Sequence, residues 1–311
     1  MHPKPTSSYL FVRLVYMLAT LLTVITLVFG LVRLAPGGPF DSERRLPPDI
    51  EANLRAAYHL DEPIHQQYAR YMGGLIQGDL GPSFRQKDFD VNALLAAGLP
   101  VSAGLGIAAL LTALLLGIGI GAAAGFNQGN IIDRLMMAIN NLNIALPTIV
   151  VAPLMILIFA VTLRWLPAGG SDSIWHFVLP TIALALPYSA AIARLTRAGI
   201  IATKTQAHVK TAIAKGLNKS RLIARHILPV ALLPVVSFLG PASATLLTGS
   251  VVVEQVFDLP GIGRYFVQGA LNRDYTLVMG VVVIYSAVIV TFNFIVDLAY
   301  AWLDPRIRFG Q

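Results

Sequence analysis

Six long intervals of this sequence contain no Asp, Glu, Lys or Arg, and this pattern limits the chain to a membrane fold. They are residues 14–32, 91–132, 135–163, 173–193, 226–253 and 275–296. Each can hold a helix of about 20 residues, the length that crosses about 30 Å of hydrocarbon. The chain has 311 residues, of which 56% are hydrophobic and 13% charged, outside the usual range of a soluble domain. The sequence therefore predicts an all-α, polytopic membrane protein with six transmembrane helices.

The boundaries of the first two spans need separate arguments. The first apolar run ends in residues 33–39, which are not a small-residue cleavage site, so we predict a retained helix and not a signal peptide. The second interval has room for two spans. Gly98-Leu99-Pro100 is a helix start signal and residues 127–130 are a stop signal, which favours a single span between them.

Basic residues are concentrated in one loop, and this predicts the orientation of the chain. Residues 194–225 carry eight basic residues and no acidic ones, whereas residues 36–98 carry nine acidic and six basic ones. Loops rich in Lys and Arg stay in the cytoplasm. Both termini are then cytoplasmic and residues 36–98 lie outside. The net charge of +7 reflects this asymmetry and not a nucleic-acid surface.

The outer segment is predicted to form a small helical cap. Pro47-Pro48-Asp49 opens one helical pattern that runs to about Tyr58, and Asp61-Glu62-Pro63 opens a second. Four side chains share one face of the second helix: Ile64, Tyr68, Tyr71 and Leu75. The cap either contacts a soluble partner or restricts the pore mouth, and the alternative is that it simply covers the bundle. The chain contains no cysteine, so disulfides do not hold it.

The predicted units follow from these boundaries. Residues 1–35 form the N-terminal tail and first span, residues 36–98 the cap, and residues 99–311 a five-helix core with a cytoplasmic loop at 201–228.

A stripe of small residues marks the second span. It consists of Ala109, Ala113, Gly117, Gly121 and Gly125, each four residues from the last. Such a stripe lets two helix backbones approach closely in lipid. We interpret it as a packing surface; the alternative is a surface that slides during gating.

Polar and proline positions within the later spans are ambiguous. Proline occurs at 147, 153, 180, 187, 234 and 241, which favours helices that face protein or a water-filled pathway. The candidate pathway or bundle residues are Asn140, Asn143, Asn293 and Asp297. An intramembrane carboxylate is a functional candidate, although Asp297 lies near the interface, where a structural hydrogen bond is the preferred interpretation.

Motifs for chemistry are missing. There is no G-x-x-x-x-G-K-[ST] phosphate loop, no H-E-x-x-H, no G-x-S-x-G and no Cys/His cluster. We predict no catalytic residue, no metal site and no ATP hydrolysis by this chain. Inverted repeats and midplane acidic residues of a secondary transporter are not apparent either.

The basic loop contains a short helix followed by a turn. A helix is predicted from about 205 to 215, ending at Gly216, which can adopt positive φ. The string from Lys210 to Gly216, followed by His226, Leu228 and Pro229, resembles the E-A-A-x-x-x-G-x9-I-x-L-P signature of ABC importer membrane subunits, although Lys210 and His226 depart from it. The alternative is a loop that only contacts lipid head groups.

The resemblance implies that this loop docks on a separate ATPase. The implied ATPase-coupling residues are Lys210, Thr211, Ala212, Lys215, Gly216, Leu217, Leu228 and Pro229.

The resemblance extends along nearly the whole chain. The strings at 34–40, 58–63, 78–83, 249–254, 259–263, 270–275 and 303–306 are similar to the B-type permeases of bacterial oligopeptide importers, within the peptide/nickel permease family. This implies a type I ABC importer permease in the inner membrane. Implied partners are a C-type permease, two ATP-binding subunits that hold ATP and Mg, and a periplasmic binding protein that delivers peptide. A dipeptide or nickel permease, or a membrane scaffold without transport, is the alternative.

The segment after the fifth span is a candidate outer gate. It contains Glu254, Gln255, Asp258, Pro260 and Gly261, and Pro260-Gly261 is a turn signal. A carboxylate at the outer mouth can stay hydrated or meet a docked partner. We expect the segment to contact the binding protein or the peptide; the alternative is a loop that re-enters and packs into the bundle.

Overall fold

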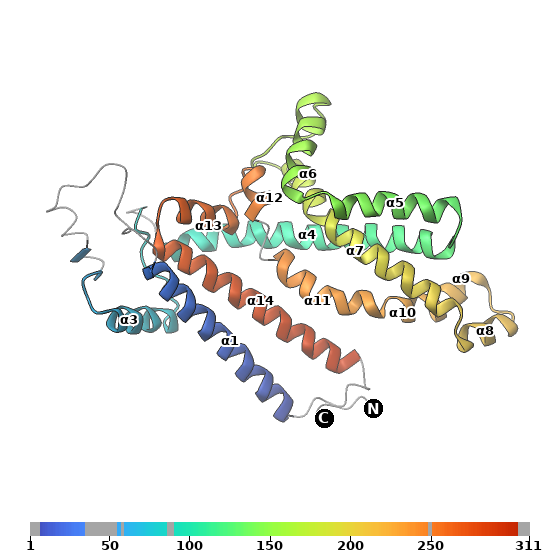
Figure 1. Ribbon diagram of the computed structural model, residues 1–311, viewed down its shortest axis with the longest axis horizontal. Helices are drawn as coiled ribbons and strands as arrows, with labels where there is room; N and C mark the ends of the chain where they lie inside the picture. Colours follow the sequence, from blue (N-terminus) through green and yellow to red (C-terminus); the bar gives the residue numbers. More distant parts are fainter. Residues whose placement is uncertain (1–6, 35–54, 57–58, 86–89, 248–250, 304–311) are drawn as a thin grey trace.

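The computed structural model describes residues 7–34, 55–56, 59–85, 90–247 and 251–303. It is an elongated helical bundle (Figure 1), and β pairing among the described residues is one bridge between Pro82 and Asp90. Five helical segments are long and apolar enough to cross a membrane, and a pair of helices bent by 104° is a sixth candidate. The prediction of an all-α membrane protein is confirmed, with the bent pair counted as one span.

The helix bounds are given with the labels of Figure 1. The long helices are α1 (Ser7–Leu34), α3 (Ile64–Ile76), α4 (Val91–Phe126), α5 (Ile131–Ala145), α7 (Val178–Lys204), α11 (Leu233–Leu247), α13 (Ile262–Leu271) and α14 (Tyr275–Leu303). The short ones are α6 (Thr148–Met155), η1 (Ile156–Thr162), η2 (Ile174–Phe177), α8 (Ala207–Ala214), α9 (Lys219–Leu222), η3 (Ile223–Ile227), α10 (Leu228–Ala231) and α12 (Val251–Val256).

Helices α4 and α7 are packed most closely. The predicted stripe of small residues faces α7, and all five of its residues are buried. A Cβ placed on Gly117 would lie 2.6 Å from the Ile192 Cβ, and one placed on Gly121 would lie 2.4 Å from the Ala193 carbonyl oxygen. The interpretation of the stripe as a packing surface is therefore confirmed, because only glycine fits at these positions.

Helix α4 begins at Val91, so the prediction of a helix start at residues 98–100 is wrong. Pro100 lies inside the helix. The first turns are held by packing, because Val91, Leu94 and Leu95 are buried against Leu80 and α14. Gly98 instead allows close approach, since a Cβ there would lie 2.9 Å from the Tyr265 ring. The predicted boundary between cap and core at residue 98 therefore falls inside a continuous helix.

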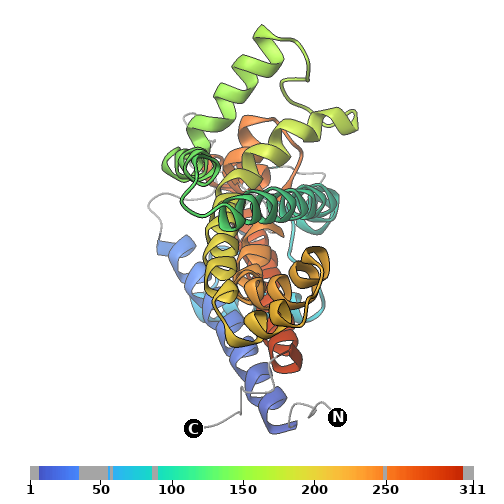
Figure 2. The same cartoon turned by 90° about the vertical axis from the view of Figure 1, so that its right-hand side faces the viewer.

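The third predicted span is broken and not a single helix. Leu146 is extended (φ −90°, ψ 121°) because the proline that follows disfavours helical backbone at this residue. Pro147 then starts α6, and α6 continues as the π-helix η1. The α6–η1 arm projects away from the bundle in both views (Figures 1 and 2).

Helix α3 confirms the second predicted cap helix. It packs on the end of α1, where the Phe29 ring lies 5.2 Å from Tyr68 and 6.0 Å from Tyr71, centroid to centroid. Ile64 is 64% exposed and so does not join this contact. Most of the first predicted cap helix, residues 47–54 and 57–58, lies outside the described residues.

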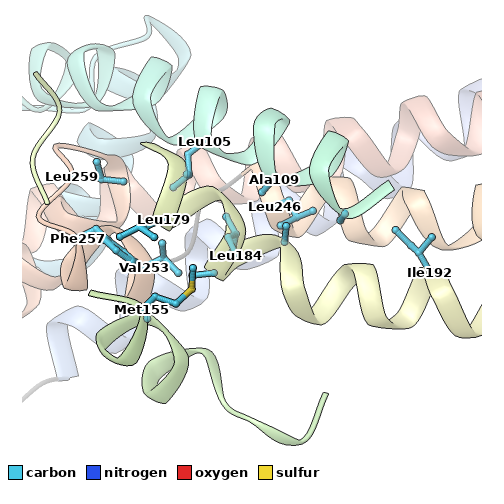
Figure 3. Packing of buried hydrophobic residues seen from close by; sticks show 14 of the residues in the cluster. Leu105, Ala109, Met155, Leu179, Leu184, Ile192, Leu246, Val253, Phe257 and Leu259 are labelled. Carbon is cyan, nitrogen blue, oxygen red and sulfur yellow. The ribbon is translucent and has the colours of Figure 1, made fainter. Parts of the chain in front are cut away.

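The elements sort to the two ends of the bundle. The α4–α5 turn and α8 lie toward one end, and α3 and α13 lie toward the other (Figure 1). The main buried core includes Leu105, Leu179, Val253 and Phe257 (Figure 3).

We predict that Gly121→Ala destabilises the bundle by about 1–3 kcal/mol, because the added methyl group overpacks the α4–α7 contact. Gly119→Ala is the matched control, since a Cβ at Gly119 meets nothing within 4 Å. Thermal unfolding of the purified variants measures both. Equal unfolding temperatures for the two variants would contradict the packing role.

Candidate functional site: a projecting helix and a buried loop

Helix α8 ends in a turn that depends on Gly216. Gly216 has φ +74°, its amide donates to Ile213 O at 2.9 Å, and the Leu217 amide donates to Ala212 O at 3.3 Å. These two bonds form a Schellman motif, in which the residue after the helix adopts left-handed backbone. The predicted stop at Gly216 is confirmed, and α8 lies within the predicted range of 205–215.

One face of α8 is attached to the bundle. Val209 is buried in an apolar cluster with Ile200 of α7 and Ile227 and Ala231 of the returning segment. Ala212, on the same face, is also buried. His208 Nε2 also lies 3.2 Å from the backbone oxygen of His226. Helix α8 is therefore in contact with both α7 and η3.

The opposite face of α8 is open and carries both charge and apolar surface. Lys210, Thr211 and Lys215 are exposed, and Ile213 between them is 57% exposed. This face of α8 therefore presents two lysines and one apolar side chain to its surroundings.

The remaining coupling candidates lie beside this face. Ala212 is buried, Gly216 is exposed and Leu217 is half-buried at the turn. Leu228 packs against the apolar cluster, and Pro229 is exposed in the first turn of α10. Leu228 and Pro229 thus begin the helix that returns to the membrane and do not join the open face.

Helix α4 connects the two ends of the molecule. It has 36 residues and is therefore about 54 Å long. Ala122 and Phe126, near its C-terminal end, pack against the cluster that holds α8. Ser102, in the N-terminal third of α4, accepts a hydrogen bond from the Ile262 amide at 2.9 Å.

The segment after the fifth span packs into the bundle, and Glu254 is the centre of this packing. Glu254 is 0% exposed, and its Oε2 accepts the Gly263 amide at 2.7 Å. That amide belongs to the first turn of α13, where the helix dipole favours a negative charge. A Cβ on Gly261 would lie 2.3 Å from Glu254 Oε2 and 2.6 Å from Ser102 Oγ, so glycine makes room for the carboxylate.

The expectation that Glu254 is hydrated at the pathway mouth is therefore wrong. The carboxylate finds its donors in α13, which the local sequence could not reveal. Gln255 and Asp258 are exposed, and Asp258 pairs with Arg264 at 2.8 Å. The Asp258 side chain is 72% exposed, so this pair contributes little to stability. Pro260 is half-buried and Gly261 is buried. The alternative of a loop that re-enters and packs describes the structure better.

The candidate pathway residues do not form one group. Asn140 is buried, and its Nδ2 donates to Ala190 O of α7 at 3.0 Å, whereas Asn143 is half-buried. Asn293 is exposed and lines a small cavity beside α1. The side chain of Asp297 lies outside the described residues. Asn140 therefore donates a hydrogen bond to the backbone of a neighbouring helix.

One ion pair was missed by the sequence reasoning. Arg197 of α7 donates to Asp133 of α5 at 2.6 and 2.8 Å. Asp133 Oδ2 also accepts the Gly129 amide, so the pair fixes the α4–α5 turn to α7. The only sequence signal is an acidic residue in the first turn of α5, and this does not reveal the partner. Among the described residues, no group of three His, Asp or Glu side chains could hold a metal ion.

Comparisons with known proteins agree with this architecture. Residues 113–309 match the family described as binding-protein-dependent transport system inner membrane component. Solved structures with a similar fold include an amino acid ABC transporter (TM-score 0.52, 21% identity, 67% of this chain and 92% of that one). Another is an inward-facing methionine ABC transporter (TM-score 0.51, 20% identity, 67% of this chain and 96% of that one). The fold is thus that of a type I ABC importer permease, a multi-pass membrane protein.

Curated relatives extend the similarity over nearly the full length. An oligopeptide transport system permease, OppB of Haemophilus influenzae, is 46% identical over 97% of this chain and 99% of its own length. OppB of Escherichia coli K12 is 46% identical over 93% and 95%. A dipeptide transport system permease, DppB of Bacillus subtilis, is 42% identical over 96% and 97%. The chain belongs to the binding-protein-dependent transport system inner membrane component family.

We predict that Glu254→Ala destabilises the protein by about 1–3 kcal/mol or more, because the Gly263 amide loses its buried acceptor. Glu254→Gln keeps the shape and one acceptor, so its effect should be smaller. Gln255→Ala is the control at the next, exposed position. Thermal unfolding is the measurement, and a wild-type unfolding temperature for Glu254→Ala would rule out this role.

Proposed function

We propose that this chain is the permease subunit of an ATP-driven ABC importer that takes up oligopeptides by alternating access. The support is the near full-length similarity to permeases named for oligopeptide transport in two organisms. The structural observation that carries the proposal is the open face of α8, attached by its other face to α7, η3 and the end of α4.

Each proposed partner has a separate role in transport. A C-type permease completes the pathway, a periplasmic binding protein delivers peptide, and two ATP-binding subunits hold ATP and Mg. This chain contains no phosphate-binding loop in its sequence, so the energy of ATP reaches it only through contacts with those subunits. Lys210, Ile213 and Lys215 would form the contact on this side.

The proposed mechanism uses the close packing of α4 and α7. When the ATP-binding subunits close, α8 moves with them and displaces the cluster that includes Ile200 and Phe126. Because backbones are in contact at Gly117 and Gly121, α4 and α7 move together. The other end of α4 holds the α12–α13 loop through Ser102, so the movement reaches the opposite side of the bundle.

A surface for the C-type permease is proposed on the projecting arm. Ile149, Leu157 and Val161 of α6 and η1 are 61%, 54% and 58% exposed. Asn141 of α5 is exposed nearby in sequence, and an amide facing lipid is costly, so a protein or a pathway on this side would stabilise it.

Dipeptide uptake is the second candidate, because the dipeptide permease of Bacillus subtilis is 42% identical. The two candidates are distinguished by measuring the uptake of labelled peptides, about two to six residues long, by the reconstituted complex. Transport of dipeptides alone would replace oligopeptides as the cargo.

We predict that Gly216→Val uncouples ATP hydrolysis from uptake. Valine at φ +74° costs about 1–2 kcal/mol and favours loss of the turn that presents α8. Gly129→Val is the matched control, because Gly129 also has positive φ (+84°) but lies in the α4–α5 turn. Peptide-stimulated ATP hydrolysis and uptake at equal expression are measured. Normal coupling in Gly216→Val, or equal loss in both variants, would contradict the role of α8.

The proposed orientation has both termini and α8 in the cytoplasm. Reporters fused after Gln311 and inserted near Asn218 should then read cytoplasmic, and one near Gln86 should read external. This expectation rests on the eight basic residues of 194–225. An external signal at Asn218 would place α8 away from any ATPase and overturn the proposal.

A further inference from the structure

A cavity of about 330 Å³ lies at the end of the first span that is remote from α8. It is enclosed by the last turns of α1, by α3 and by the segment leading to α4, with Thr276 and Met279 of α14 on one side. Phe29, Leu80 and Phe84 give it apolar walls, and Arg33 and Tyr71 also line it. The cavity is separate from the open face of α8 and from the Glu254 cluster.

Arg33 supplies a positive charge to this cavity. Its guanidinium carbon lies 5.3 Å above the Phe29 ring, the side chain is half-buried, and its Nε is buried without a hydrogen-bond acceptor. Of the other charged groups that line the cavity, Arg70 and His59 both contact Glu62. The Asp79 carboxylate accepts the Gly81 amide and forms no ion pair with Arg33. No carboxylate of the described residues forms an ion pair with Arg33, and a partly desolvated cation of this kind favours an anion beside it.

Two further polar groups at the cavity lack partners. The Tyr71 hydroxyl is buried with no hydrogen bond, and burial raises the pKa of Tyr71 to about 12. The group therefore keeps its proton and is available as a donor at neutral pH. Gln67 uses its Nε2 on Leu60 O and Glu62 O, which leaves its Oε1 buried and without a donor. The cavity thus offers a cation and a hydroxyl donor together with one free acceptor.

The position of the cavity favours a lipid over a soluble anion. Arg33 is the second-last residue of the apolar segment Phe11–Leu34, which places it at a membrane interface. A second cavity of about 350 Å³ adjoins the same turns of α1 and is lined by Leu31, Val32 and Val278. Leu27 and Leu31 are 60% and 65% exposed, so an apolar surface continues from this region along α1.

We propose that the cavity binds the phosphate group of a membrane phospholipid, with Arg33 as its charge partner, Tyr71 as a hydrogen-bond donor and the acyl chains along α1. The bound lipid would join α1 to α3, which also meet through the contacts of Phe29 with Tyr68 and Tyr71 and through a hydrogen bond of 2.7 Å between the Thr26 and Tyr68 hydroxyls. The proposal concerns stability at the membrane interface and does not depend on which cargo is transported.

The test uses the complete transporter, stripped of lipid in detergent and then titrated with phosphatidylethanolamine. Native mass spectrometry measures the lipid retained, and thermal unfolding measures the lipid-dependent shift of each variant against its own lipid-free state. Arg33→Gln should reduce retention about tenfold or more, because a charge-assisted contact is lost. Tyr71→Phe should reduce it less, and Arg33→Lys should keep part of it.

The matched control is Arg164→Gln, which removes an exposed positive charge that does not line the cavity. It should behave as the wild type. A lipid-dependent shift in Arg33→Gln as large as that of the wild type would overturn the proposal. Inorganic phosphate or a substrate peptide that reproduces the full shift would also overturn it, because the site would then be one for a soluble anion.

Discussion

The contact between α4 and α7 is the interaction on which the rest of this structure depends. In lipid, helices associate through close packing and not through exclusion of water, so the shape of the contact decides its strength. Gly117 and Gly121 bring the α4 backbone against Ser189, Ile192 and Ala193, where any side chain would overlap. The resulting pair is a stiff unit that reaches from one side of the bundle to the other.

The two candidate sites are placed at opposite ends of this unit, and each is attached by a different kind of contact. At one end, α8 is held by an apolar cluster around Val209 and Ile227. At the other end, the α12–α13 loop is held by buried hydrogen bonds that involve Ser102 and Glu254. Apolar contacts tolerate small shifts, whereas a buried carboxylate with few donors allows only one arrangement. The structure thus combines an adaptable attachment beside α8 with a rigid one at the loop.

Two buried carboxylates of the described residues follow one rule: each is matched by a partner from a distant segment. Asp133 meets Arg197, and Asp274 accepts the Phe84 amide at 3.2 Å. Burial without such partners would cost several kcal/mol for each charge. Arg33 departs from the rule at a membrane interface, and this departure is what distinguishes its cavity from the other hollows of the surface.

The sequence by itself determined the features that depend on local composition and short spacing. These are the apolar spans, the packing stripe on α4, the helix α3 and the turn at Gly216, because hydrophobic period and glycine geometry act within a few residues. Only the tertiary structure decided the start of α4 before Pro100, the 104° bend and the burial of Glu254. Those depend on partners far away in the chain, such as Ser102 and Ile262, which are separated by 160 positions. A local pattern cannot reveal a hydrogen bond or a packing surface that exists only after distant helices meet.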